Sequence, residues 1–395
     1  MTDRLYYRDS ALLEFEAEIV AAGSNEGKYY TILDRSAFYP TSGGQLFDTG
    51  QINEIEITDV IEDDNHEVRH ISEQPPGKVG DKVKGRVDRE RRFKNRQVHT
   101  AQHILSQAFV KLFGCDTVSV HLGEEYANIE LNTESLTPEQ TAAAEKLANE
   151  IIRDNLPVDV IFADDELLKY LPIRKIPERE GTLRVIKIGE FECSACGGTH
   201  CHRTSEVGLI KITGFEKVRG RYSVGFLAGI LAVEDYLVRY EVTDRLSKTF
   251  TCHVTDLPDK LDKLASENKT IQREITRLLK ELLPVRAEEM AAEVKTAGKI
   301  AVCGRIISDL DNNAAGHLAS LVADRINGMA IIMTADRLLL AVSEQTGLHA
   351  GELIKKFAAR VNVRGGGSQK AAQVGGVVPE KYDEYLDLII KLANE

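Results

Sequence analysis

Two pairs of potential metal ligands lie far apart in the sequence. His99 and His103 are four residues apart in a segment with helical spacing, so both imidazoles would project from one helix face. Cys196 and His200 are also four residues apart and enclose a Gly-Gly pair that allows a tight turn. One thiolate and three imidazoles suit tetrahedral zinc. The spacing therefore predicts one zinc ion per chain, bound by these four residues.

Other assignments remain open for the second pair, which lies in the stretch ECSACGGTHCH. Cys193, Cys201 and His202 are rival ligands, and Cys193 forms a CxxC pair with Cys196. The HxxxH pair lacks the glutamate of an HExxH motif, so the metalloprotease interpretation is excluded. Four protein ligands fill a tetrahedral site, so either the coordination expands or the ion mainly orients substrate and water.

Composition limits the class of protein. A chain of 395 residues, 43% hydrophobic and 28% charged, is expected to fold into several domains. No apolar run approaches the roughly 18 residues of a membrane helix, and the N-terminus lacks the pattern of a signal peptide. We therefore expect a cytoplasmic protein without a membrane partner. Six cysteines in such a chain favour metal or thiol chemistry over disulfides.

Periodicity along the chain predicts a multidomain α+β protein. Short alternating runs separated by turn residues predict a small β-barrel over 1–87. Helical spacing then begins, and mixed strands and helices predict an α+β domain over 88–228 that contains the zinc ligands. A long helix, starting near Ala228, is expected over 229–296, and a C-terminal α/β domain over 297–395.

Part of the predicted long helix has an apolar seam with steps of four and three residues. Only Asn268 interrupts this spacing, and asparagine at one seam position is a known register device. The pattern predicts a coiled coil that pairs two copies of the chain; packing against the same chain is the alternative. The seam residues are Leu257, Leu261, Leu264, Ile271, Ile275, Leu278 and Leu282.

Two segments could contact nucleic-acid phosphates. The net charge of −12 argues against indiscriminate binding, but it leaves room for local basic surfaces. One candidate surface, which could equally be a solvated strand and helix start, consists of Lys82, Lys84, Arg86, Arg89, Arg91, Arg92, Lys94 and Arg96. The other candidate surface lies in a glycine-rich stretch, which could equally be a flexible connector. It consists of Arg364, Gly365, Gly366, Gly367 and Lys370.

Several motifs resemble one family in the family's own order. HTAQH and CGGTHCHRTSEVGLIKI resemble the zinc-bearing editing domain of alanyl-tRNA synthetases and their free-standing relatives. AFYPTSGGQLFDTG resembles the barrel signature of that family, and VRGGGSQKAAQVGG resembles the glycine-rich loop of a C-terminal domain shared with DHH phosphoesterases. The chain starts close to the barrel and has no DHH triplet. Its layout resembles the long form of the free-standing alanyl-tRNA editing proteins.

This resemblance implies a zinc-dependent enzyme that hydrolyses serine, and often glycine, from mischarged tRNA(Ala). The two basic segments would then hold the tRNA. A threonyl-type deacylase and a non-catalytic RNA-binding protein with structural zinc are the alternatives. The polar groups expected to form the substrate pocket are Thr41, Ser42, Gly43, Gly44 and Gln45 in the barrel loop, Thr100 beside the metal ligands, and Ser119 and His121 after the helix.

Overall fold

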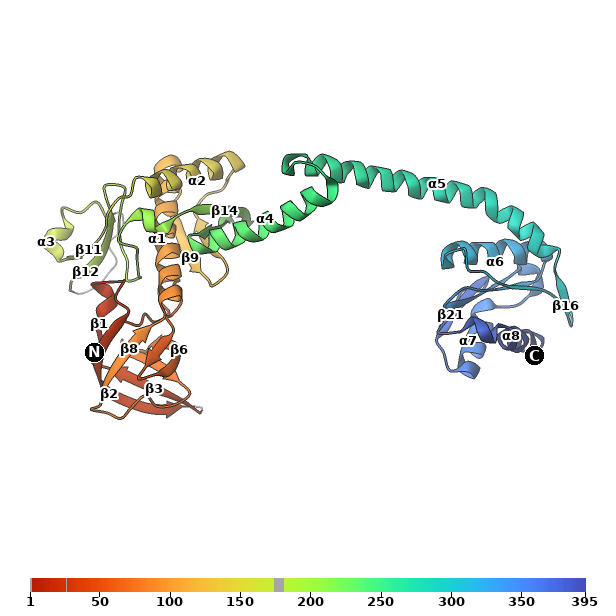
Figure 1. Ribbon diagram of the computed structural model, residues 1–395, viewed down its shortest axis with the longest axis horizontal. Helices are drawn as coiled ribbons and strands as arrows, with labels where there is room; N and C mark the ends of the chain where they lie inside the picture. Colours follow the sequence, from red (N-terminus) through yellow and green to blue (C-terminus); the bar gives the residue numbers. More distant parts are fainter. Residues whose placement is uncertain (1, 26, 174–180) are drawn as a thin grey trace. The chain divides into compact units, whose positions relative to one another are not determined.

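The computed structural model describes residues 2–25, 27–173 and 181–395. The chain forms two compact units, Met1–Leu246 and Ser247–Glu395. The first unit contains a barrel and a mixed α+β part, and the second is an α/β domain (Figure 1). The multidomain α+β class is confirmed, while the bounds of the four predicted domains stay predictions.

The N-terminal strands close into a barrel, as the alternating sequence predicts. Ile19, Leu33 and Val68 are fully buried inside it, and strand residues between such positions face solvent. The short elements β1 (Asp3–Arg4), η1 (Leu5–Tyr7) and β4 (Arg35–Ser36) lie outside the barrel order. The barrel strands, in their order around it, are β2 (Glu14–Asn25), β3 (Lys28–Leu33), β7 (Val68–Ser72), β6 (Ile55–Glu62), β5 (Gly50–Ile52) and β8 (Lys82–Val87).

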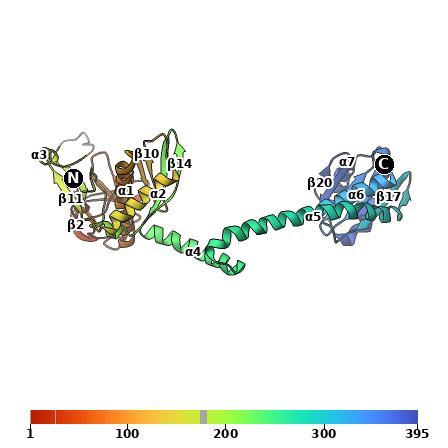
Figure 2. The same cartoon turned by 90° about the horizontal axis from the view of Figure 1, so that it is seen from above.

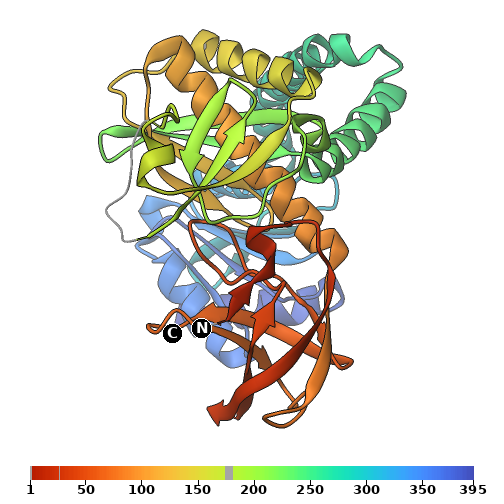
Figure 3. The ribbon, with the colours of Figure 1, turned by 90° about the vertical axis from the view of Figure 1, so that its left-hand side faces the viewer.

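Helix α1 (Arg89–Phe113) leads directly out of the barrel (Figure 3). Asp88 caps its start by accepting a hydrogen bond from the Arg91 amide, and Gly114 ends it in the left-handed conformation. Helix α2 (Pro138–Arg153) lies beside α1 (Figure 2). Both helices share a core with an antiparallel sheet. Its strands, in spatial order, are β14 (Ile210–Val218), β15 (Arg221–Ala228), β10 (Ala127–Leu131) and β9 (Thr117–Leu122).

A second, three-stranded sheet of the first unit delivers the cysteine-containing loop. Strand β13 ends at Ala195, so Cys196 follows it directly. The loop then reaches the short helix η2 (Thr204–Val207). The sheet consists of β11 (Val158–Ala163), β12 (Leu183–Ile188) and β13 (Glu192–Ala195), with the short helix α3 (Asp165–Leu168) after β11.

The predicted long helix is interrupted. The structure has α4 (Ile230–Phe250), then η3 (Val254–Asp256), then α5 (Leu257–Ala291). Thr251 adopts a positive φ of 48°, which ends α4, and a proline occupies the first turn of α5, where its missing N–H group is tolerated. The expectation of one continuous helix is therefore corrected to two.

The second unit is built on a six-stranded mixed sheet. The end of α5 and α6 (Asn312–Ile326) pack against one face, and α7 (Ala350–Val361) and α8 (Tyr382–Asn394) pack against the other. No helix among the described residues is long and apolar enough to cross a membrane. In spatial order the strands are β16 (Lys295–Ala297), β17 (Ile300–Ile306), β18 (Met329–Met333), β19 (Arg337–Val342), β21 (Ala371–Gly375) and β20 (Gly365–Gly367), and η4 (Glu344–Thr346) and η5 (Pro379–Lys381) lie between elements.

Candidate metal centre

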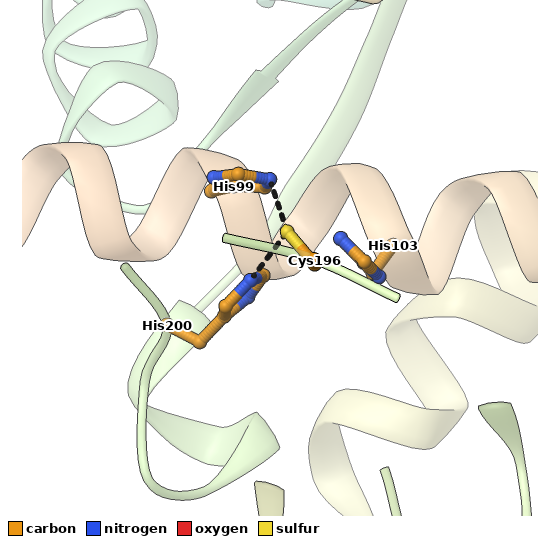
Figure 4. A group of neighbouring side chains, drawn as sticks. All are labelled: His99, His103, Cys196 and His200. Carbon is orange, nitrogen blue, oxygen red and sulfur yellow. Dashed lines mark hydrogen bonds between the residues drawn. The ribbon is translucent and has the colours of Figure 1, made fainter. Parts of the chain in front are cut away.

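The four predicted ligands come together in the first unit. His99 and His103 project from α1, and Cys196 and His200 approach from the loop after β13 (Figure 4). Their ligand atoms all lie within 4.8 Å of one another. The Cys196 sulfur is 3.4 Å from His99 Nε2 and 3.3 Å from His200 Nε2. Ligands of a tetrahedral zinc ion are about 3.4 to 3.6 Å apart, so this donor set fits zinc.

The barrel loop reaches this cluster through Gln45. This residue is 1% exposed, and its Oε1 lies 2.8 Å from His99 Nδ1. Its Nε2 donates to Thr199 Oγ1, and the Thr199 amide donates back to Oε1 at 3.0 Å. A side chain at Gly198 would collide with the His99 ring. Gln45 therefore connects the barrel, α1 and the cysteine loop, and orients His99 instead of facing a substrate.

The other two histidines also have partners at Nδ1. Thr100 Oγ1 lies 3.4 Å from His200 Nδ1 and accepts from the Cys201 amide at 2.9 Å. Ser194 Oγ lies 3.1 Å from His103 Nδ1, and a Glu192 oxygen lies 3.4 Å from the same atom. All three imidazoles therefore direct Nδ1 toward protein and leave Nε2 for an ion. Partners of this kind fix the orientation of metal-binding histidines.

The charges within the cluster favour the thiolate form of Cys196. Burial alone would raise the pKa of the Cys196 thiol, but the imidazoles of His99, His200 and His103 hold this pKa well below its ordinary value. Burial also lowers the pKa of His200 strongly. For His103, burial acts downward, but Glu192 and Cys196 raise its pKa to about 10. A thiolate is the form of cysteine that binds metal, so the lowered pKa favours the form of Cys196 that can act as a ligand.

The Gly-Gly pair of the barrel loop forms a tight turn. Ser42 and Gln45 exchange backbone hydrogen bonds, and Gly43 and Gly44 have φ values of 55° and 84°. A side chain at Gly44 would lie 2.7 Å from the Val120 carbonyl oxygen. Residues 41–44 are exposed, whereas Gln45 is buried. The predicted pocket residues Thr41 to Gly44 therefore form an exposed edge next to the cluster.

The remaining predicted pocket residues lie on α1 and β9. Thr100 is fully buried and contacts His200, so it acts on the ligand. Ser119 and His121 alternate along β9 with Val120 and Leu122, whose side chains pack on the α1 side of the sheet. Both are exposed on the opposite face of the sheet. Their place in the substrate pocket stays a prediction, on the exposed face of a strand whose Leu122 amide donates to the Gly44 carbonyl.

The basic residues of β8 face a row of glutamates. The register of β2 and β8 pairs Glu14 with Arg86, Glu16 with Lys84 and Glu18 with Lys82. Lys84 Nζ lies 3.7 Å from a Glu16 oxygen. Three positive side chains on β8 lie opposite three negative side chains on β2, so these six paired positions carry no net charge. Cross-strand pairing of opposite charges stabilises the sheet and weakens the case for phosphate binding.

Arg92 and Arg96 are interior residues, which removes them from the predicted tRNA surface. Arg92 is 1% exposed and forms an ion pair at 2.5 Å with Asp48, which is fully buried. Arg96 is 6% exposed and donates to the His200 carbonyl and to Glu206. Both residues lie seven positions before a metal-binding histidine, on the same face of α1. They attach the barrel and the cysteine loop to that helix.

Three other residues of the basic run lie nearer the surface. Arg91 forms an ion pair at 2.6 Å with Glu124, and its guanidinium lies over the Phe47 ring. Arg89 is exposed, and Lys94 is partly exposed. Arg89 and Lys94 are therefore better candidates than Arg91 for contacts with a polyanion, because Arg91 is already paired with Glu124.

The glycine-rich stretch forms the edge strand β20. Side chains at Gly365 and Gly367 would collide with β21, whereas Gly366 has open space. Arg364 is exposed, and Lys370 forms an ion pair at 2.6 Å with Glu344. The glycines therefore permit close strand pairing, and Gly366 leaves the backbone accessible at this edge.

The apolar seam of α5 is largely uncovered within the second unit. Leu257 is 5% exposed. The other six predicted seam residues, Leu261, Leu264, Ile271, Ile275, Leu278 and Leu282, are between 42% and 57% exposed. A row of this kind on one helix is suited to pairing with another helix.

Comparisons with known proteins agree with this layout. The family model of class II (A) tRNA synthetases matches residues 3–91, and the DHHA1 domain model matches residues 299–395. The model "Threonyl and Alanyl tRNA synthetase second additional domain" matches residues 183–223, which include Cys196 and His200.

Individual relatives cover the chain from end to end. It is 29% identical to the alanyl-tRNA editing protein AlaX-L of Pyrococcus horikoshii, over 99% of this chain and 98% of the relative. It is 31% identical to the alanine–tRNA ligase of Halorubrum lacusprofundi, over 98% of this chain but only 43% of the ligase. The C-Ala domain of Aquifex aeolicus alanyl-tRNA synthetase covers 26% of this chain and 98% of its own, at 19% identity and a TM-score of 0.24, too low to establish a shared fold. The resemblance to the alanyl-tRNA editing proteins is thus confirmed over the length of the chain.

Proposed function

We propose that this chain is a zinc-dependent aminoacyl-tRNA deacylase that removes serine, and also glycine, from mischarged tRNA(Ala) in the cytoplasm. The observation that carries the proposal is the cluster of His99, His103, Cys196 and His200, which fits zinc and adjoins an exposed loop. The similarity to AlaX-L supports editing of tRNA(Ala) as the reaction.

The reaction is hydrolysis of the ester between the amino acid and the terminal ribose of the tRNA. A bound zinc ion would supply positive charge beside the ester carbonyl. The chain's own residues hold the site in shape: Gln45 and Thr100 fix the orientations of His99 and His200. Thr41 and Ser42 carry hydroxyls on the exposed turn that leads to Gln45, the residue that contacts His99. A site that hydrogen-bonds a serine hydroxyl disfavours alanine, which lacks it.

We propose fewer residues for the contacts with the tRNA backbone than the sequence predicts. Arg89 and Lys94 remain at the start of α1, while Arg364, Gly366 and Lys370 remain in the second unit. Lys82, Lys84 and Arg86 face glutamates, so their contribution would be small. Each phosphate contact adds to the salt dependence of binding, so replacing a contacting residue should flatten that dependence.

We also propose that two copies pair through the seam of α5. The supporting observation is its row of six exposed apolar side chains. Exposed apolar residues with steps of three and four match the interface of a two-stranded coiled coil. Pairing would cover them and would give each assembly two copies of the glycine-rich edge.

The test is deacylation of Ser-, Gly- and Ala-tRNA(Ala) by the purified protein, with His103→Ala and His66→Ala compared. His66 is an exposed barrel residue paired with Glu62, so its replacement is the matched control. We expect the wild type and His66→Ala to hydrolyse Ser- and Gly-tRNA(Ala) faster than Ala-tRNA(Ala). His103→Ala should lose this activity. A folded His103→Ala protein with full activity would refute the proposal. Loss of its fold together with its activity would instead favour the structural-zinc alternative.

A further inference from the structure

The Nδ1 partners of the three histidines differ in charge. His99 faces the neutral amide of Gln45, and His200 faces the neutral hydroxyl of Thr100. His103 faces a hydroxyl and also a carboxylate, that of Glu192, at 3.4 Å. The Glu192 carboxylate beside His103 needs an explanation, because a buried carboxylate destabilises a protein unless a positive charge or hydrogen bonds compensate it.

Glu192 lies deep in the first unit. Its side chain is 3% exposed, and its Oε2 atom has no hydrogen-bond partner among the described residues. Within the parts of the chain that the structure describes, His103 is its one ion-pair partner. Lys187, on the neighbouring strand, is instead paired at 2.6 Å with Glu190.

Strand β13 explains how Glu192 reaches the metal centre. Successive side chains of a strand alternate between its two faces. Glu192 and Ser194 therefore share the face directed at His103, and Cys196 follows two residues later as a ligand. Cys193, on the other face, packs in a separate small core. The spacing of Glu192, Ser194 and Cys196 combines one ligand with two partners of another ligand.

A metal-bound His103 is a neutral imidazole and no longer compensates the Glu192 carboxylate, but the charge of the proposed zinc centre can do so. A zinc dication with one thiolate and three neutral imidazoles carries a net charge of about +1. One carboxylate beside His103 brings the total to zero. We propose that Glu192 is a positioning residue that holds His103 in place and balances the positive charge of the zinc centre; this rests on the zinc site of the proposed function. Ser194, the closer acceptor, contributes a hydrogen bond without charge.

The consequence is a contribution of Glu192 to zinc affinity. Replacement of a residue that supports a metal ligand weakens metal binding by about 10- to 100-fold. Glu192→Gln keeps the size of the side chain and removes only its charge. We therefore expect Glu192→Gln to bind zinc about 10- to 100-fold more weakly than the wild type. Ser194→Ala keeps the charge and should lose less.

The experiment measures zinc affinity of the full chain by competition with a chromophoric chelator. Glu190→Gln is the matched control, because Glu190 is 89% exposed and lies two residues before Glu192. Its affinity should equal that of the wild type. In Co²⁺-loaded proteins, the visible absorption bands should keep their four-coordinate form in Glu192→Gln, which shows that the ligands are unchanged. The thermal midpoint of each metal-free protein controls for folding.

The outcomes separate this inference from the proposed function. If the wild type binds no zinc, the proposed function itself fails. If the wild type binds zinc and Glu192→Gln binds it equally well, the inference is overturned. A larger loss in Ser194→Ala than in Glu192→Gln also overturns it, because the hydroxyl would then be the main partner. Should Glu192→Gln fail to fold, Glu192→Asp replaces it, and a loss greater than that of Ser194→Ala refutes the role of charge.

Discussion

Replacing Arg92 with alanine should destabilise the first unit strongly. The Arg92 guanidinium bonds to both oxygens of Asp48, to the Ser10 carbonyl at 2.9 Å and to the Ala37 carbonyl. Asp48 also accepts from the Tyr39 amide at 2.7 Å. Both charged side chains are excluded from solvent, at 1% and 0% exposure. Removing Arg92 leaves the Asp48 carboxylate buried without its cation.

Breaking a buried ion pair by removing one partner costs about 3 to 5 kcal/mol of unfolding free energy. For a unit of 246 residues, such a loss corresponds to a fall of about 6 to 20 °C in melting temperature. Arg89→Ala is the matched control, because Arg89 is exposed in the same helical turn. A surface replacement of this kind should change stability by no more than about 0.5 kcal/mol.

Tyrosine fluorescence during urea unfolding can follow the first unit within the full chain. The chain has no tryptophan, and all but two of its 12 tyrosines precede residue 247. We expect the midpoint of Arg92→Ala well below those of the wild type and Arg89→Ala. Equal midpoints, together with weaker tRNA binding by Arg92→Ala, would refute the reasoning and return Arg92 to the tRNA surface.

Three further predictions concern the barrel, its loop and the α5 seam. His70 is fully buried on β7, and burial lowers its pKa from 6.5 to about 4. The folded state therefore favours the neutral imidazole. The stability of the fold is unaffected above pH 6.5, and about 3 kcal/mol of unfolding free energy should be lost as the pH falls to 4. Stability–pH curves should show that His70→Gln lacks this loss, and identical curves would contradict it. Gly44→Ala should weaken zinc binding in chelator competition more than Gly43→Ala, because the new side chain would meet the Val120 carbonyl, whereas the space at Gly43 is open; equal affinities would refute this. Leu264→Asp should yield monomers in light scattering, and an unchanged mass, or a monomeric wild type, would exclude the seam as an interface.

The metal ligands could be predicted from sequence because each pair has local geometry. Spacing by four residues on a helix brings His99 and His103 together in any fold that keeps the helix. Glycines make the turn between Cys196 and His200 possible. The two pairs were joined because together they supply one thiolate and three imidazoles, a set that suits tetrahedral zinc, although no local pattern places segments so distant in sequence side by side.

The basic run was predicted as one surface because its charges were counted without asking which way each side chain points. Arg92 and Arg96 point into the interior. Seven-residue steps from Arg92 and Arg96 to the two α1 histidines place all four on one helix face, so the signal for burial was present. The neutralising glutamates of β2 could not be found, since the strand register depends on barrel closure. For Ser119 and His121, alternation shows that they share a face of β9, but not which face covers the core.

The residues that support the ligands were mostly missed. Gln45 was identified, but as a substrate contact, and Thr199 and Glu192 were not considered. Alternation along β13 was the available signal for Glu192, because it shares a face with Ser194 and points toward the ligand loop. Burial of a carboxylate cannot be read from sequence, so its role became visible only beside His103.

The most direct test of the central claim is the dependence of deacylation on zinc occupancy. The metal is removed by a chelator, the chelator is dialysed away, and zinc is returned in steps while hydrolysis of Ser-tRNA(Ala) is measured. We predict that the activity falls to background, rises in proportion to bound zinc and reaches its full value at about one ion per chain. A metal-free, folded protein that deacylates Ser-tRNA(Ala) at the full rate would contradict the account.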